Sequence, residues 1–175
     1  MTSHFLHVAD RADEALDPAA ALAFVSAPGF GGIAMFVGRV RDLNHGREVA
    51  GISYDVYEPL ALARFAEIAE QAQREAGPRL KCYIAHAKGR LAVGELAVVI
   101  AAGTPHRDEA FRACRLMIEA VKHSTPIWKQ EHYVDGDSEW SEGCSLCDAP
   151  AGQGSPGHDH GQEHEQPRAD TGARR

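Results

Sequence analysis

Three groups of basic residues in this sequence could bind an anion, and the first is Arg39-Val40-Arg41. It follows a run of apolar residues, Gly32 to Gly38, that is typical of a buried strand. Residues two apart in a strand face the same way, so the two guanidiniums could converge on one anion. A solvated strand end is the alternative interpretation, and the pair taken alone favours it.

The second group is His106-Arg107, at the start of a long expected helix that opens with Thr104-Pro105. A helix N-terminus offers free N–H groups and a partial positive charge, which suit an anion. Basic side chains are unfavourable at that end of a helix, so their presence hints at a ligand. Side chains that simply point into solvent explain them equally well.

The third group contains Lys122 and Lys129, on either side of Pro126. The helix macrodipole favours a lysine in the last turn, which gives Lys122 an ordinary explanation. Lys129 lies in an apolar segment beside Trp128, and its ordinary explanation is weaker. Two ammonium groups that are held together and partly desolvated repel each other. Each then becomes a better proton donor or, when neutral, a nucleophile.

Hydrophobic periodicity predicts the elements that must position these groups. Strands are expected near residues 5–8, 32–41, 52–57, 80–85, 96–102 and 128–134, and helices over 18–26, 59–77 and 104–126. Turns are expected at Asn44-His45-Gly46, Gly89 and Gly94. The apolar stripe of the last helix is expected to be Phe111, Cys114, Ile118 and Val121. Strand pairs with no helix between them favour an α+β domain, a mostly antiparallel sheet with packed helices.

Composition narrows the function classes. The chain has 175 residues with 44% hydrophobic and 25% charged residues, enough for one domain. A formal net charge of -7 argues against nucleic-acid binding. No apolar run approaches the roughly 20 residues of a membrane helix, so no membrane partner is expected. The first residues do not form a secretory signal, and a cytoplasmic location is the expectation.

The composition changes after Trp140, which predicts a domain over residues 1–140 and a disordered tail over 141–175. Cys82 and Cys114 lie in apolar segments and are expected to be small core residues. The tail carries residues suited to zinc, nickel or copper, namely Cys144, Cys147, His158, His160 and His164. A solvated low-complexity tail is the favoured alternative, and the domain itself is expected to need no cofactor.

The order and spacing of four motifs resemble the large-subunit family of molybdopterin synthases, the MoaE family. The resemblance covers Gly31 to about Trp140. Its motifs are Phe36-Val37-Gly38-Arg39-Val40-Arg41, Gly94-Glu95 before an apolar strand, His106-Arg107 before Ala110-Phe111, and Lys122 through Pro126 with Trp128, Lys129 and Glu131. The fold it implies is α/β-hammerhead-like.

The family resemblance implies a sulfurtransferase of molybdenum cofactor biosynthesis. Its members take sulfur from the thiocarboxylated C-terminal glycine of a small ubiquitin-like subunit and transfer it, in two rounds, to cyclic pyranopterin monophosphate. The product is the molybdopterin dithiolene, and the assembly is a homodimer of this subunit within a heterotetramer. The site residues carried over are catalytic Arg41, Lys122 and Lys129, with substrate-binding Arg39, Val40, Arg41, His106, Arg107, Lys122, Lys129, Gln130 and Glu131.

Distance along the last expected helix favours a site shared between two copies. Fifteen residues separate Arg107 from Lys122, which is roughly 22 Å of helix. A monophosphorylated pterin is too short to bridge that gap comfortably. Either the two ends are separate sites, or a symmetric dimer brings Arg107 of one chain beside Lys122 of the other.

Two interpretations from other classes compete with the enzyme. One is a non-catalytic dimeric anion-binding module that uses the same basic residues. The other is a metal-handling protein that acts through its tail.

The chain also departs from the resemblance after Trp140, where Ser141-Glu142-Gly143-Cys144 replaces the basic residues of the family. A contribution of that segment to a neighbouring pocket is therefore in doubt.

Overall fold

A computed structural model describes residues 3–141 of the chain. Three helices and eight strands alternate irregularly along it. In chain order they are β1 (His4–Asp10), α1 (Pro18–Val25), β2 (Gly32–Arg39), β3 (Leu43–Asn44), β4 (Arg47–Val56), α2 (Glu58–Ala76), β5 (Lys81–Ala92), β6 (Leu96–Thr104), α3 (Arg107–Ser124), β7 (Ile127–Tyr133) and β8 (Ser138–Ser141).

The strands form one mixed sheet in the order β2-β6-β5-β4-β7-β8. All pairs are antiparallel except β1 with β5, so the expected mostly antiparallel α+β fold is confirmed. Strand β5 pairs with β1 along its first part and with β4 from Gly89 onward. Gly89 has φ +92° at this change of partner. It therefore lies inside a strand, and the expectation of a turn there is wrong.

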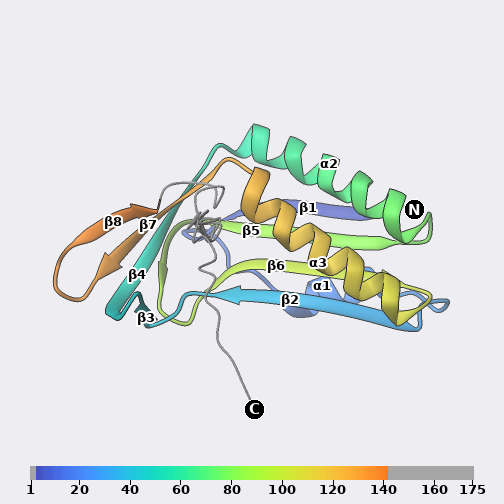
Figure 1. Cartoon of the computed structure of the whole chain (residues 1–175), viewed down its shortest axis with the longest axis horizontal. Helices are drawn as coiled ribbons and strands as arrows, with labels where there is room; N and C mark the ends of the chain where they lie inside the picture. The colour runs from blue at the N-terminus through green and yellow to red at the C-terminus, as the bar shows by residue number, and fades with distance from the viewer. Residues whose placement is uncertain (1–2, 142–175) are drawn as a thin grey trace, which may run out of the picture.

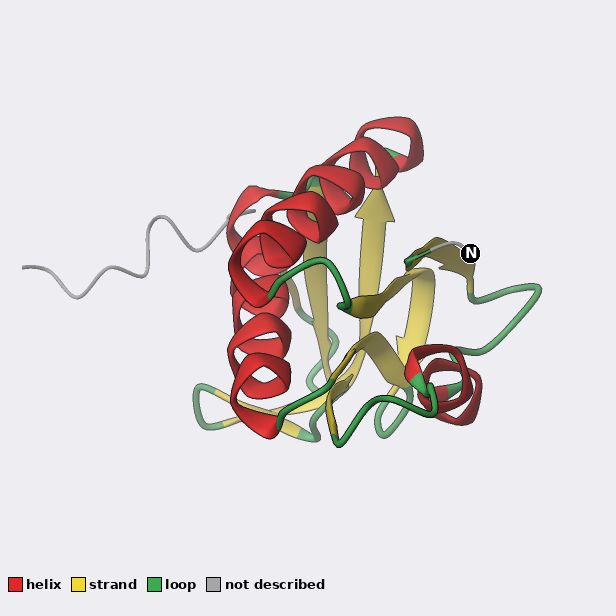
Figure 2. Cartoon of the chain, turned by 90° about the vertical axis from the view of Figure 1, so that its right-hand side faces the viewer, coloured by secondary structure: helices red, strands yellow, loops and turns green. Residues whose placement is uncertain are grey.

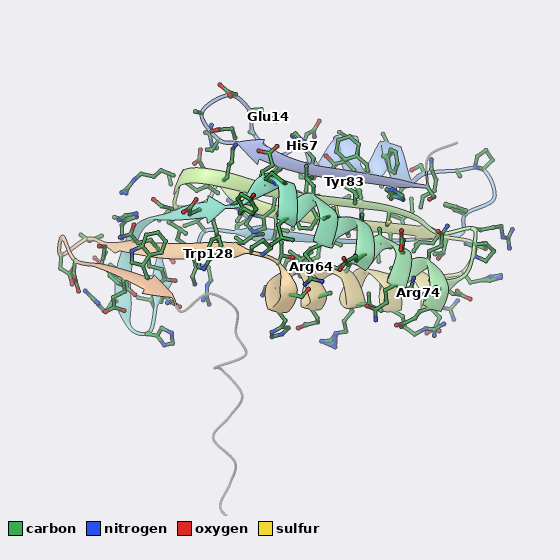
Figure 3. All side chains as sticks on the ribbon, turned by 90° about the horizontal axis from the view of Figure 1, so that it is seen from above. His7, Glu14, Arg64, Arg74, Tyr83 and Trp128 are labelled. Carbon is green, nitrogen blue, oxygen red and sulfur yellow. The ribbon has the colours of Figure 1, made fainter. Side chains whose placement is uncertain are left out.

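Helices cover both faces of the sheet (Figure 2). Helices α2 and α3 pack against each other on one face, over a core that includes Phe65, Ile84, Ile100 and Met117. The short helix α1 lies on the other face, over a second core around Val99 and Leu91. Figure 3 shows this division from above, with Tyr83 on the α1 side and Arg64 and Arg74 on α2.

The start of α3 is fixed by a close approach of two backbones. Gly31 N–H donates to the Pro105 carbonyl at 3.0 Å. A Cβ on Gly32 would lie 2.6 Å from Arg107 Cα, so only glycine fits there. The helix begins at Arg107 rather than at Thr104, which is the last residue of β6. Any larger residue at position 32 would push the first turn of α3 away from the sheet.

Two further expectations need correction, and one strand is additional to those expected. Phe111 is 63% exposed and does not belong to the buried face of α3, because Ala110, Ala113 and Met117 turn inward instead. Strand β2 ends at Arg39, where a register shift against β6 breaks the ladder, so Arg41 lies beyond the strand. The sequence does not predict strand β8, which pairs with β7 as the second half of a hairpin.

Several local predictions are confirmed. Asp17 caps α1 by accepting from Ala19 N–H at 2.8 Å, with Pro18 in the first turn. His45 and Gly46 turn the chain between β3 and β4 with φ values of +49° and +78°. Cys82 and Cys114 are buried, free thiols. None of the helices within residues 3–141 has the length and apolarity needed to cross a membrane.

Candidate functional site

A buried carboxylate organises one end of the sheet. Figure 1 shows β3, β4, β7 and β8 gathered at this end, beyond the ends of α2 and α3. Glu131 in β7 is 4% exposed there. Its Oε1 accepts from Lys129 Nζ at 2.8 Å, and its Oε2 accepts from Asn44 Nδ2 at 2.6 Å and from the Tyr133 hydroxyl at 2.8 Å. A buried carboxylate with three donors is fully satisfied.

These donors determine the charge of Glu131. Burial alone would raise its pKa, but the hydrogen bonds from Lys129, Tyr133 and Asn44 outweigh burial and hold the pKa below its usual range. The same hydrogen bond and the burial of the phenol raise the pKa of Tyr133 to about 12. Glu131 is therefore an anion at neutral pH, and Tyr133 remains a proton donor to it.

Arg41 joins this cluster through Asn44. Its Nη2 donates to Asn44 Oδ1 at 3.1 Å, while the amide nitrogen of Asn44 faces Glu131. Arg41 is exposed, so its remaining N–H groups face solvent. The cluster of Arg41, Asn44, Lys129, Glu131 and Tyr133 therefore presents two cations, an ammonium and a guanidinium, anchored on one buried anion. We call it the Glu131 cluster.

Lys122 lies at the last turn of α3, the end of that helix directed toward the Glu131 cluster (Figure 1). Its Nζ is 5.9 Å from the centroid of the Phe36 ring, a cation–π distance. The side chain is exposed at one end of a groove between β2 and α3, lined also by Ile33, Phe111 and Arg115. Only Thr125 and Pro126 separate α3 from β7, so Lys122 and Lys129 belong to adjoining elements.

Val40 and Arg39, two of the expected substrate-binding residues, do not belong to the Glu131 cluster. The side chain of Val40 is 3% exposed and packs in the core, and its backbone groups pair with Glu95 and Gly94. Arg39 Nε donates to the Gly94 carbonyl at 2.9 Å. Strand β2 ends at Arg39, so Arg39 and Arg41 do not lie in one strand. The two guanidiniums bind different partners.

Gln130 lies between Lys129 and Glu131 in β7. Successive side chains of a strand point to opposite faces, so Gln130 faces away from the Glu131 cluster. Its amide donates to Ser138 Oγ in β8 at 3.2 Å. In this structure Gln130 therefore contributes to the β7–β8 hairpin rather than to the cluster.

His106 and Arg107 lie at the opposite end of α3 from Lys122 (Figure 1). Both side chains are exposed. His106 occupies the N-cap position without a side-chain cap, and its carbonyl accepts from Thr104 Oγ1 at 2.7 Å. Within one chain the helix thus separates His106 and Arg107 from Lys122 and the Glu131 cluster.

Sequence reasoning missed Asn44, Tyr133 and Arg47. The sequence indicates Asn44 only as a turn residue. Tyr133 continues the period-two face of Lys129 and Glu131, a signal that could have found it. Arg47 stacks over the Tyr133 ring at 3.7 Å and pairs with Asp135, Asp137 and Glu139. It ties the β3–β4 turn to the β7–β8 hairpin, and so holds Tyr133 against Glu131.

The metal candidates Cys144, Cys147, His158, His160 and His164 lie outside the described residues. Among residues 3–141, no three histidine, cysteine or acidic side chains are grouped as a metal site would require. Burial raises the pKa of Cys82 to about 12 and that of Cys114 to about 11. Neither thiol of the domain forms a thiolate at neutral pH.

Comparisons with known proteins agree on one family. The model of the family described as MoaE protein matches residues 11–124. A molybdopterin synthase catalytic subunit of Synechococcus elongatus is 48% identical over 118 residues, which cover 67% of this chain and 72% of that protein. Molybdopterin synthase catalytic subunit 1 of Mycobacterium tuberculosis is 41% identical over 128 residues, 73% of this chain and 86% of that protein.

Solved structures give the same result. The crystal structure of molybdopterin synthase from Staphylococcus aureus superimposes with a TM-score of 0.70 at 30% identity, covering 81% of this chain and 98% of that one. A molybdopterin biosynthesis MoaE protein from Burkholderia ambifaria has a TM-score of 0.68 at 29% identity, covering 82% and 92%. With a family model that matches most of the described domain, this chain belongs to the MoaE family.

Proposed function

We propose that this chain is the catalytic subunit of a molybdopterin synthase and transfers sulfur from a small partner subunit to cyclic pyranopterin monophosphate. The family membership and the names of the relatives support the enzyme class. Those relatives are named as subunits, which supports a partner chain. The observation that carries the proposal is the Glu131 cluster, two anchored cations with no reactive thiol inside the described domain.

Neither thiol within residues 3–141 is ionised at neutral pH, which supports an external sulfur donor. Sulfur transfer needs a nucleophilic sulfur, and a thiol with a pKa of about 11 or 12 is protonated at pH 7. A thiocarboxylate on the C-terminus of a small ubiquitin-like subunit would bring the sulfur already ionised. In each of two rounds, a C–S bond replaces a C–O bond at one carbon of the pterin side chain, and the displaced oxygen leaves that carbon. The acyl–S bond of the carrier is hydrolysed, with water supplying the oxygen of the new carboxylate.

The cations have matching roles. Arg41 offers a planar guanidinium, the group best suited to a carboxylate or thiocarboxylate. Lys129 and Lys122 offer ammonium groups that stabilise the negative charge developing at the reacting carbon and sulfur and can deliver a proton. His106 and Arg107 at the α3 N-terminus suit the phosphate of the pterin. The carrier's tail and the substrate are both anions, which requires this many positive groups.

A homodimer would complete the pocket, because α3 separates Arg107 from Lys122 by roughly 22 Å of helix. We place two copies of this chain at the centre of a heterotetramer, each contributing His106 and Arg107 to the pocket of the other. The competing anion-binding module would use the same cations without turnover. The relatives' names as catalytic subunits favour the enzyme.

The tail remains a separate proposal. Two cysteines and three histidines could hold about one zinc per chain in tetrahedral geometry. Truncation after Ser141, where β8 ends, should abolish zinc binding and leave sulfur transfer intact. A full-length protein with no measurable zinc affinity would refute the zinc site and favour the alternative, a solvated tail without a metal. The cytoplasmic location also stays a prediction.

Reconstitution tests the proposed function. The purified chain is incubated with cyclic pyranopterin monophosphate and a small subunit that ends either in a thiocarboxylate or in an ordinary carboxylate. Mass spectrometry should find the dithiolene product only with the thiocarboxylate. Equal results with both carriers, or no product with either under conditions where a known family member is active, would refute it.

A further inference from the structure

We propose that Asn44 is a positioning residue that links Arg41 to Glu131. It thereby fixes the positions of the two cations of the site, Arg41 and Lys129, relative to each other. This inference rests on the proposed sulfur transfer. The side chain of Asn44 lies between Arg41 Nη2, 3.1 Å from its Oδ1, and Glu131 Oε2, 2.6 Å from its Nδ2. Asn44 is the single asparagine in the 175-residue chain.

Arg41 and Glu131, the two hydrogen-bond partners of Asn44, allow its side-chain amide only one orientation. A guanidinium can only donate and an ionised carboxylate can only accept. The amide oxygen must therefore face Arg41 and the amide nitrogen must face Glu131. A flipped amide would put a donor against a donor and an acceptor against an acceptor, so the group is fixed by chemistry as well as by shape. No other uncharged side chain of this length offers both functions.

The backbone presents Asn44 at this point. It is the last residue of β3 and pairs with Arg47 of β4 across the turn made by His45 and Gly46. Arg47 in turn holds Tyr133 and the acidic residues of the β7–β8 hairpin. Both hairpins therefore meet at Glu131, one through Asn44 and the other through Tyr133.

The consequence concerns Arg41. It follows the end of β2, where no strand pairing holds it, and its side chain is exposed. The bond to Asn44 ties its guanidinium to the carboxylate that also holds Lys129. Without that bond a long, exposed side chain samples many rotamers. Misplacement of a catalytic group by about 1 Å can cost about 100-fold in rate.

Two substitutions separate this role from a merely structural one. Asn44→Leu removes both hydrogen bonds at similar size. Asn44→Asp keeps the shape but sets a second carboxylate against Glu131. Two carboxylates at that distance share a proton readily, and a protonated carboxyl donates and accepts as the amide does. Each variant is compared with the unmodified chain at the same pH, so effects of pH on the other groups cancel.

We expect Asn44→Leu to lose about 10- to 100-fold in kcat for sulfur transfer at every pH. Asn44→Asp should be similarly poor at pH 8 and should regain activity relative to the unmodified chain as the pH falls toward 5.5. Near-normal kcat in Asn44→Leu would overturn the inference. So would an activity ratio of Asn44→Asp that does not rise as the pH falls.

A second measurement is independent of turnover. Because the chain has one asparagine, labelling asparagine side chains with ¹⁵N gives a single pair of amide signals in an NMR spectrum. One proton of the pair should be shifted downfield and exchange slowly in the unmodified chain. A rapidly exchanging, unshifted pair would refute the hydrogen bond to Glu131. If the unmodified chain transfers no sulfur while this signal is as expected, the proposed function fails and the Asn44 arrangement stands.

Discussion

Lys129 and Glu131 occupy the same face of β7, and the ammonium of one lies 2.8 Å from the carboxylate of the other. The pair is unequal in exposure, since the Lys129 side chain is 33% exposed and that of Glu131 is 5% exposed. The anion is thus buried as an anchor while the cation reaches the surface. This geometry holds a lysine at a fixed place without removing it from the reach of a ligand.

The first prediction concerns the two lysines. Lys129→Ala and Lys122→Ala should each fold and yet lose at least about 100-fold in sulfur transfer, because the ammonium groups stabilise charge that develops in the reaction. Arginine at either position should rescue only in part, since a guanidinium keeps the charge but does not readily donate a proton. Steady-state kinetics with the thiocarboxylated carrier gives the comparison.

Lys88 offers a matched control for Lys129. Its side chain is 31% exposed and pairs with Glu58 and Asp10. Lys88→Ala should therefore remove a comparable ion pair without loss of turnover. Near-normal activity in both Lys122→Ala and Lys129→Ala would end the catalytic assignment of these residues.

The second prediction concerns stability and Glu131. Its pKa is depressed in the folded chain, so its stabilising contribution is present above the pKa of the unfolded state, near 4.5, and is lost as pH falls through the folded value. Glu131→Gln should lower the free energy of unfolding by about 1–3 kcal/mol at pH 7, because a charged acceptor of three donors is replaced by a neutral one.

The difference in unfolding free energy between the unmodified chain and Glu131→Gln should shrink as the pH falls below 4.5. In that range the unfolded chain takes up a proton at Glu131 before the folded chain does. Urea unfolding at pH 7 and at the lowest pH where both chains remain folded measures it. A difference that stays constant, or a variant as stable as the unmodified chain at pH 7, would show that Glu131 is not ionised and bonded as described.

Several features of this fold depend only on residues that are close in the sequence, and these could be predicted. Asp17, Pro18 and the period-three-and-four pattern of α2 act locally, so the helices could be predicted with their approximate bounds. Lys129 and Glu131 share a face because they are two apart in one strand. Such effects depend on neighbours in the sequence.

Asn44 could not be predicted in the same way. Its partner Glu131 is 87 positions away, and their contact depends on how β3, β4 and β7 are ordered in the sheet. The exposure of Phe111 escaped prediction because a helical pattern gives the apolar stripe only to within a residue or two. The end of β2 at Arg39 depends on a register shift against β6, which leaves no local signal.

The third prediction concerns His86, which is 7% exposed and lies edge-on to the Tyr54 ring. Burial lowers its pKa to about 4, although the hydrogen bond from Nδ1 to the Ala87 carbonyl acts in the opposite direction. The unfolded chain takes up this proton near pH 6.5, before the folded chain does. The neutral ring therefore contributes stability above pH 6.5 that is lost as pH falls to about 4.

The loss should amount to about 3 kcal/mol, since a tenfold change in proton affinity corresponds to about 1.4 kcal/mol. His86→Gln should reduce the slope of unfolding free energy against pH between 6.5 and 4, whatever it costs at pH 7. Denaturant unfolding at several pH values gives the slope. Parallel curves for the two chains would mean that His86 is not held neutral by burial.

The fourth prediction concerns the shared pocket. Arg107→Ala and Lys122→Ala chains should each be inactive as homodimers. When the two are co-assembled, mixed dimers should regain partial activity, because one of their two pockets then has both Arg107 and Lys122. Subunit exchange is confirmed by native mass spectrometry of chains that carry different isotopes.

Two Lys122→Ala preparations mixed in the same way serve as the control and should stay inactive. If mixed dimers form and no activity returns, the two ends of α3 do not serve one pocket. The site would then have to be completed within one chain or by the partner subunit.

The origin of the transferred sulfur tests the central claim most directly. The small subunit is prepared with ³⁴S in its C-terminal thiocarboxylate, and the chain is supplied unlabelled with cyclic pyranopterin monophosphate. Mass spectrometry of the pterin product should show ³⁴S at both positions of the dithiolene, because the carrier supplies both sulfur atoms. The two thiols within residues 3–141, Cys82 and Cys114, are buried and protonated. Unlabelled sulfur in the product, or no dithiolene at all, would contradict the account.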